Sequence, residues 1–463
     1  MNLLPKHIHI VGICGVATSA LAIAFHNKGW KVTGSDKGFF PPVSTELEKN
    51  NISFYAGWHP ENIGHPEIIM TGGGGTSPSN PELIYAKENN IPVYPYAEIL
   101  KKYFIKKNSI VTVGTWGKTT TSSLLSYILI SAGLDPSYFT GGLSLSHDTG
   151  ALSDSDWSVV EGDEYQVSIS DKRPKFVYYS PTHLLLTSVS WDHADLYPTE
   201  DLYFNEFKKL ISEIPNDGKI VACVDDSGVK KIIDKNKIIS YGKDKYADYF
   251  YHSIEHSRNG LKFIIENKGE KYHIASCMLG KFNAENMTGC FAMAMEIGIK
   301  PEIIINAIKD FKGIKRRFEK RFENENKTVL DCHAPTPEKA ASVLESLREI
   351  YSQKIVAVYE PNIGGRQKSS SHIYDNAFKN ADLVIIPRLT KLKIANDGSE
   401  KPLEGPELVD IIKRTHAHVK YIEDDEILTK ESIASGDIIV FLGSHGFRGM
   451  IEDTITSLRQ QSQ

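Results

Sequence analysis

The feature that most constrains this chain is a glycine-rich loop between an apolar segment and a helix-like segment. Residues Ile110–Val113 are apolar, the loop Val113-Gly-Thr-Trp-Gly-Lys-Thr-Thr-Thr121 follows directly, and Ser122–Ser131 is predicted to be helical. Backbone N–H groups of such a loop and of the next helix turn bind phosphate oxygens. The sequence therefore predicts an α/β domain with a phosphate site at the carboxyl end of a strand.

Two side chains of this loop have predicted roles. Lys118 is expected to neutralise charge on the β- and γ-phosphates of a nucleotide, and Thr119 is expected to place a hydroxyl on Mg²⁺. The strict motif has glycine where this chain has Thr112. The alternative is a chance Gly-Lys-Thr turn, which the strand–loop–helix context disfavours.

Acidic residues follow two later apolar segments. The first is Val159-Val-Glu-Gly-Asp-Glu-Tyr165, and the second runs from Leu184 to Asp192, His193 and Asp195. Carboxylates at the carboxyl edge of a sheet, beside a phosphate loop, anchor phosphate-bound Mg²⁺. The alternatives are a solvated acidic turn for the first and a structural histidine for the second. Two such edges predict a site for more than one divalent ion.

The first residues contain a weaker nucleotide signal. Gly12 and Gly15 follow the strand-like segment 7–11, and Gly34-Ser-Asp36 ends the next one. A complete G-x-G-x-x-G is absent, and a nicotinamide dinucleotide and a uridine diphosphate fit this pattern equally well.

Two polar groups farther along the chain are compatible with nucleotide binding. Asn283 opens a helix-like segment and could contact an adenine edge, while Arg316-Arg-Phe-Glu319 could reach a phosphoryl group. The alternatives are a helix N-cap for Asn283 and a solvated basic face for the arginines.

Strands alternate with helices throughout, which predicts an α/β protein of three domains: a Rossmann-like N-terminal domain (1–106), a central P-loop ATPase domain (107–317) and a Rossmann-like C-terminal domain (318–463). The net charge of -5 over 463 residues gives no reason to expect nucleic acid or a membrane surface as partner. Five scattered cysteines predict reduced thiols, and no signal peptide or membrane span is recognised, so a cytoplasmic protein is expected.

In this order along the chain, the motifs resemble the Mur ligase family, whose members build and recycle the peptide stem of bacterial peptidoglycan. The resemblance implies an ATP- and Mg²⁺-dependent ligase that joins an amino acid or peptide to UDP-N-acetylmuramate through an acyl-phosphate. It assigns Lys118, Glu161 and His193 to catalysis. The remaining roles that it implies are ATP binding by Gly114, Thr115, Gly117, Lys118, Thr119, Thr120, Asn283, Arg317 and Asp331; metal binding by Thr119, Glu161 and His193; and UDP-sugar binding by Gly12, Gly15, Ser35, Asp36 and Asn80.

Within the family, the stretch from Glu164 to Phe176 is more similar to muropeptide ligases, which attach L-alanyl-γ-D-glutamyl-meso-diaminopimelate in recycling, than to L-alanine ligases. The muropeptide is therefore the expected acceptor, and L-alanine is the alternative.

Other positions depart from the family pattern. Trp116 and Phe282 replace a common histidine each, residues 331–337 lack the family's His-His pair, and Asn362 replaces an arginine. Because the last two changes lie in the acceptor-binding domain, a nucleotide-binding sensor without ligase activity is the rival from another class. A NAD(P)-dependent oxidoreductase would leave the phosphate loop without a role.

Overall fold

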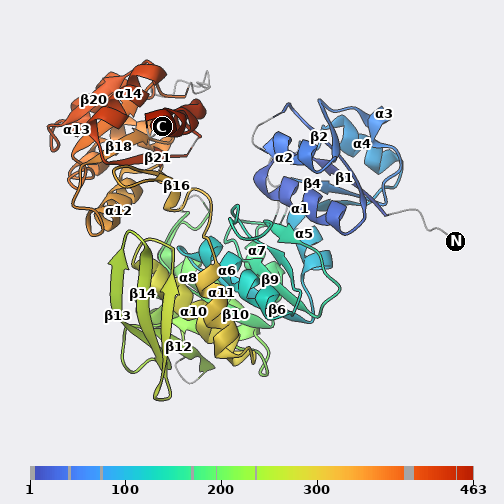
Figure 1. Ribbon diagram of the computed structural model, residues 1–463. Helices are drawn as coiled ribbons and strands as arrows, with labels where there is room; N and C mark the ends of the chain where they lie inside the picture. The colour runs from blue at the N-terminus through green and yellow to red at the C-terminus, as the bar shows by residue number, and fades with distance from the viewer. Residues whose placement is uncertain are drawn as a thin grey trace. The chain divides into compact units, whose positions relative to one another are not determined.

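The computed structural model describes residues 6–39, 43–72, 77–167, 171–193, 196–234, 237–390, 401–444 and 446–461 (Figure 1). Within these residues the strands form three sheets of five, ten and six strands. The chain divides into two compact units: residues 1–254, 262–276 and 282–312 make the first, and residues 255–261, 277–281 and 313–463 make the second. The α/β class with three parallel-sheet regions agrees with the prediction, while the three domain boundaries stay a prediction.

The first sheet is wholly parallel and has the order β3-β2-β1-β4-β5. The strand order reverses beside β1, and nucleotides bind at the carboxyl ends of the strands at such a reversal in a parallel sheet. Its strands are β1 (His7–Val11), β2 (Lys31–Asp36), β3 (Ser53–Ala56), β4 (Ile68–Thr71) and β5 (Val93–Pro95). The helices are α1 (Val16–Asn27), α2 (Val43–Lys49), α3 (Pro60–Ile63), α4 (Pro81–Glu88) and α5 (Tyr96–Ile99), followed by η1 (Leu100–Phe104).

The second sheet has the order β15-β14-β13-β12-β11-β10-β6-β9-β7-β8. Its central strand β6 (Asn108–Val113) pairs in parallel with β9 (Trp157–Glu161) and β10 (His183–Leu186), so all three end at the same edge. The other strands are β7 (Ser137–Phe139), β8 (Gly150–Ala151), β11 (Ile220–Cys223), β12 (Ile239–Gly242), β13 (Tyr249–Ser257), β14 (Gly260–Asn267) and β15 (Glu270–Ser276). The helices are α6 (Lys118–Ser131), α7 (Lys175–Tyr178), α8 (Glu200–Glu213), α9 (Ser227–Ile232), α10 (Phe282–Glu296) and α11 (Pro301–Asp310).

The third sheet has the order β16-β17-β21-β18-β19-β20, with β16 antiparallel to β17 and the other pairs parallel. Its strands are β16 (Glu319–Glu323), β17 (Thr328–Cys332), β18 (Ile355–Glu360), β19 (Leu383–Pro387), β20 (Val419–Ile422) and β21 (Ile438–Gly443). Helical segments are α12 (Pro337–Arg348), η3 (Gly364–Arg366), η4 (Lys368–Tyr374), α13 (Gly405–Ile412), α14 (Asp425–Ser435), η5 (Phe447–Gly449) and α15 (Met450–Gln461).

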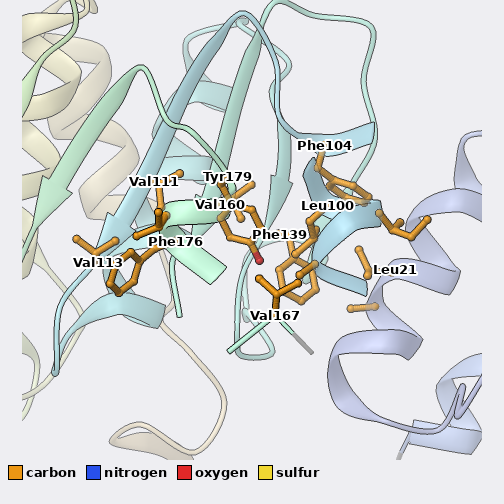
Figure 2. Close-up of a cluster of buried hydrophobic side chains, with 14 of the residues drawn as sticks. Leu21, Leu100, Phe104, Val111, Val113, Phe139, Val160, Val167, Phe176 and Tyr179 are labelled. Carbon is orange, nitrogen blue, oxygen red and sulfur yellow. The ribbon is translucent and has the colours of Figure 1, made fainter. Parts of the chain in front are cut away.

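One apolar core joins the first two sheets, which explains why they form a single unit. Figure 2 shows Leu21 of α1 and Leu100 of η1 beside Phe139 of β7, all buried in the same cluster as Val111 of β6. The central strand β6 is buried on both faces from Ser109 to Val113, as expected for a strand in the middle of a parallel sheet. No helix in the described parts of the chain has the length and hydropathy needed to cross a membrane.

Helix α6 begins at Lys118, four residues before the predicted start at Ser122. Gly117 adopts φ 83°, a left-handed conformation that ends the loop immediately before the helix. The threonines in Lys118–Thr121 have weak helix propensity, which is why the helix was predicted to begin later. The loop before them nevertheless places these residues in the first turn of α6.

Candidate active site

Two glycines give the loop after β6 its shape. Gly114 has φ 139°, and a Cβ there would lie 2.2 Å from Thr187 Oγ1, so the loop packs directly against the end of β10. Gly117 has φ 83°, and a Cβ there would lie 2.6 Å from Asn286 Oδ1 of α10. A side chain at either position would be both strained and obstructed, which is the physical reason for the glycines.

Lys118 points back across the loop to the acidic edge of β9. Its Nζ donates to Gly114 O at 2.6 Å and to Glu164 Oε2 at 2.8 Å. The other carboxylate oxygen, Oε1, lies 3.1 Å from His193 Nε2. Glu164 therefore joins two predicted catalytic residues, although the sequence had singled out Glu161 and not Glu164 as the functional carboxylate of this motif.

Glu161 faces the first turn of α6. Its Oε1 accepts a hydrogen bond from Thr119 Oγ1 at 3.0 Å, and its Oε2 accepts from Gly141 N at 2.7 Å. A hydroxyl beside a carboxylate is a donor set that suits Mg²⁺, which keeps several waters and phosphate oxygens as its other ligands. Among the described residues, no group of three or more His, Cys, Asp or Glu is arranged to hold a metal ion.

His193 has the left-handed φ of 54°. Its ring lies 4.3 Å from the ring of Tyr165 between centroids. In this conformation its Nε2 is directed to Glu164, and the predicted metal role of His193 stays a prediction. Its neighbours 194–195 lie outside the described residues, so the predicted role of Asp195 does too.

Three more residues of the predicted ATP site, Thr115, Thr120 and Asn283, belong to the same unit as the loop. Thr115 Oγ1 donates to Ser190 O at 2.9 Å, which fixes the loop to the segment after β10, and Thr120 is buried in α6. Asn283 belongs to the first turn of α10 and accepts from Asn286 Nδ2 at 3.0 Å. The helix already includes Phe282, so the N-cap alternative for Asn283 is wrong.

The predicted UDP-sugar residues gather at the carboxyl edge of the first sheet. Gly12 turns the chain after β1 with φ 83°, Gly15 precedes α1, and Asp36 Oδ2 accepts from Cys14 N at 2.8 Å. Ser35 lies beside this turn, because Gly12 N donates to its carbonyl at 2.8 Å.

Asn80 is connected to this cluster through Glu82, a residue without a predicted role. Asn80 caps α4 by accepting from Glu82 N, and Ser35 Oγ donates to Glu82 Oε2 at 2.5 Å. Glu82 also accepts from Tyr55 OH at 2.8 Å and is fully buried. Burial alone would raise the pKa of Glu82, but contacts with His9, Ser35, Tyr55 and the His59 amide lower it. No sequence pattern distinguishes this glutamate from a solvated one in a first helical turn.

Arg317 and Asp331 belong to the second unit. Asp331 is buried at the end of β17, with Arg316 Nε 3.2 Å from its Oδ1 and Arg321 Nη1 3.7 Å from its Oδ2. Burial raises the pKa of Asp331, and Arg316 opposes that shift. Arg316 also donates to Gly443 O and Ser444 O, so it organises the end of β21 and is not a solvated basic residue.

In the third sheet region, the unusual Asn362 and the nearby Arg366 both form hydrogen bonds with the backbone. Arg366, four residues after the unusual Asn362, is buried and donates to Leu403 O at 2.9 Å and Thr390 O at 2.8 Å. Asn362 Oδ1 accepts from Gly365 N at 2.9 Å, so its side chain is bonded to the backbone of the short η3. Arg366 therefore holds surrounding backbone, and it is not free to replace the missing arginine at position 362.

Comparisons with known proteins agree along the length of the chain. Residues 7–107 match the model "Mur ligase family, catalytic domain", 111–294 the "Mur ligase middle domain" and 316–445 the "Mur ligase, glutamate ligase domain". The UDP-N-acetylmuramate–L-alanine ligase of Rhizobium meliloti (strain 1021) is 31% identical over 459 residues, covering 95% of both chains. The one from Desulfitobacterium hafniense (strain Y51) is 29% identical over 451 residues, covering 95% of this chain and 97% of that one.

Solved structures show the same fold. The UDP-N-acetylmuramate-alanine ligase of Thermotoga maritima matches with a TM-score of 0.79 at 23% identity, covering 99% of this chain and 100% of that one. A murein peptide ligase from Psychrobacter arcticus matches with a TM-score of 0.67 at 23% identity, covering 98% of each chain.

The phosphate loop, the acidic edge beside it and the three α/β sheets are those of an ATP-dependent ligase that forms amide bonds. The chain belongs to the Mur ligase family, and it is a ligase of peptidoglycan synthesis.

Proposed function

We propose that this enzyme joins the carboxylate of UDP-N-acetylmuramate to the amino group of L-alanine, with ATP converted to ADP and phosphate. The observation that carries the proposal is the convergence of Lys118, Thr119 and Glu161 at one sheet edge. The choice of acceptor is supported by the 31% identity with a protein named as the L-alanine ligase. It replaces the muropeptide acceptor expected from the sequence as the main proposal.

In the first step, a carboxylate oxygen of the muramate attacks the γ-phosphorus of ATP, and the bond to the β–γ bridging oxygen breaks to release ADP. Lys118, now held by Glu164, would turn to the phosphate oxygens and balance their charge. Thr119 and Glu161 would hold Mg²⁺, which supplies further positive charge at those oxygens when bound.

In the second step, the amine attacks the carbonyl carbon of the acyl-phosphate. The C–N bond forms, the C–O bond to phosphate breaks, and the proton that the amine loses passes to the departing phosphate or to solvent. An acyl-phosphate is hydrolysed by water, so the site must exclude solvent while the intermediate exists.

The other substrate contacts follow the family assignment. Gly12, Gly15 and Asp36 would bind the uridine nucleotide at the edge of the first sheet, where Ser35 and Asn80 are fixed by Glu82. Asn283, Arg317 and Asp331 would contact ATP. The scattered cysteines, expected from the sequence to be reduced, support the cytoplasm as the place where the enzyme acts.

The second candidate is the muropeptide ligase, and a specific stretch favours it. Residues from Glu164 to Phe176 are similar to that group, and this stretch contains both the carboxylate that holds Lys118 and the buried Lys175. Because Glu164 contacts Lys118 of the phosphate loop, this similarity concerns the nucleotide site and does not by itself select the acceptor.

The test is phosphate release with ATP, Mg²⁺ and UDP-N-acetylmuramate, comparing L-alanine with L-alanyl-γ-D-glutamyl-meso-diaminopimelate. Release that depends on L-alanine supports the proposal, and release that depends on the tripeptide alone selects the recycling ligase. ATP binding with no release for either acceptor would contradict both and favour a nucleotide-binding sensor.

A further inference from the structure

Lys175 is a buried lysine for which the reaction above has no use. It opens the short helix α7, its side chain is 8% exposed, and its Nζ lies 2.6 Å from Asp163 Oδ2. Burial alone would lower the pKa of Lys175, but Tyr96 and Asp163 raise it, so the side chain stays charged. A buried ammonium is costly unless it is paired, which makes the bond to Asp163 a strong constraint on both residues.

Aromatic rings and backbone hydrogen bonds fix the pair. The Nζ of Lys175 lies 5.1 Å from the ring centroid of Tyr96 and 5.6 Å from that of Tyr165. Lys175 N donates to Tyr165 O at 3.0 Å, and Phe176 N donates to Asp163 O at 3.3 Å. The first residues of α7 are therefore attached to the acidic segment at backbone and side-chain level.

The three carboxylates of that segment face three different partners. Glu161 accepts from Thr119 and Gly141, Glu164 faces Lys118 and His193, and Asp163 faces Lys175. Asp163 is only two residues after Glu161, and its Oδ2 is held 2.6 Å from Lys175 Nζ while Glu161 accepts from Thr119 and Gly141. Without Lys175, Asp163 would offer a second hard oxygen ligand beside Glu161 in the same segment.

We propose that Lys175 is a positioning residue that keeps Asp163 out of the magnesium site, so that Glu161 holds the ion without a second carboxylate from this segment. The inference rests on the proposed function, because it takes Thr119 and Glu161 as the metal-binding pair. One carboxylate in place of two leaves more of the cation's charge for the phosphate oxygens.

The test measures Mn²⁺ binding to the nucleotide-free full-length protein by the electron paramagnetic resonance signal of free Mn²⁺. In Lys175→Met the freed Asp163 joins the site, and the dissociation constant is expected to fall about fivefold or more because a charged oxygen ligand is added. The double variant Lys175→Met/Asp163→Asn returns to the wild-type value, and Lys175→Arg keeps it. Lys172→Met, an exposed lysine of the same stretch, is the matched control.

Single Asp163→Asn keeps the proposal testable if Lys175→Met fails to fold. It leaves Mn²⁺ binding at the wild-type level if Asp163 is outside the site, and weakened binding would overturn the proposal. A dissociation constant for folded Lys175→Met equal to that of the wild type would overturn it too. Glu161→Gln separates the two claims: unchanged Mn²⁺ binding in that variant contradicts the proposed metal site itself, whatever the Lys175 variants do.

Discussion

Lys118 Nζ and Glu164 Oε2 form an ion pair of 2.8 Å in which the lysine side chain is 13% exposed and the glutamate side chain 4% exposed. The lysine that the phosphate loop presents to a nucleotide is thus already bonded to a carboxylate within the protein. Nucleotide binding must compete with this pair, since Lys118 exchanges Glu164 for phosphate oxygens.

Removing the charge of Glu164 is expected to separate binding from catalysis. In Glu164→Gln, Lys118 does not have to break an ion pair before it contacts phosphate, so a non-hydrolysable ATP analogue is expected to bind more tightly. The value of kcat is expected to fall, because His193 loses its charged partner. Unfolding free energy drops by about 1.5–3 kcal/mol, as for a buried hydrogen bond to a charged group. Calorimetric titration tests this, and weaker nucleotide binding would show that Glu164 does not compete for Lys118.

Lys118→Met is expected to lower kcat about 100- to 1000-fold, the range for losing one electrostatic contact to a developing charge. The measurement is steady-state ADP formation with saturating acceptor. Lys208→Met, at an exposed position on α8, is the control and is expected to retain full activity. Equal kcat for the two variants would remove Lys118 from the reaction.

The sequence predicted these elements unevenly. The strand–loop–helix around Lys118 and the strand before Glu161 were predictable because glycine spacing and apolar runs are local features. Glu164 was not, because its role depends on contacts with Lys118 and His193, 46 and 29 residues away. For the same reason the sequence predicts no role for Lys175, whose partner Asp163 is found only in the fold.

Glu82 should stabilise the first sheet and the geometry of Ser35. Glu82→Gln places an amide N–H₂ among donors from Ser35, Tyr55 and the His59 amide, and is expected to cost about 2–4 kcal/mol of unfolding free energy. The UDP-sugar affinity should fall in parallel. Glu88→Gln, at an exposed position on the same helix, should change neither quantity in denaturant unfolding and binding titrations.

His7 should make stability depend on pH. Burial, with the charge of Lys31, lowers its pKa from 6.5 to about 4, so the folded protein resists a proton that the unfolded chain accepts. The free energy of unfolding is therefore unaffected by His7 above pH 6.5, and it decreases as the pH falls from 6.5 toward 4.

Between pH 7.5 and pH 5 the loss amounts to about 2 kcal/mol. In His7→Gln, urea unfolding at the two pH values should differ by that much less than in the wild type. The same difference in both proteins would contradict the assignment to His7.

Helix starts show a second limit of prediction from sequence. The helix at Lys118 and the one at Phe282 both begin before their predicted starts. In the first case Gly117, with φ 83°, ends the loop directly before Lys118, and this conformation depends on the fold around the loop. Conversely, only Arg317 had a predicted role in the pair, and the fold directs the guanidinium of Arg316 to Asp331 and the end of β21.

The central claim is that the muramate carboxylate takes the γ-phosphoryl group of ATP before the amide forms. The direct measurement uses UDP-N-acetylmuramate labelled with ¹⁸O in that carboxylate, with ATP, Mg²⁺ and L-alanine, and follows the released phosphate by mass spectrometry. An acyl-phosphate route transfers one labelled oxygen to each phosphate as the amide forms. Phosphate without label, released at the same rate as the amide, would contradict the account.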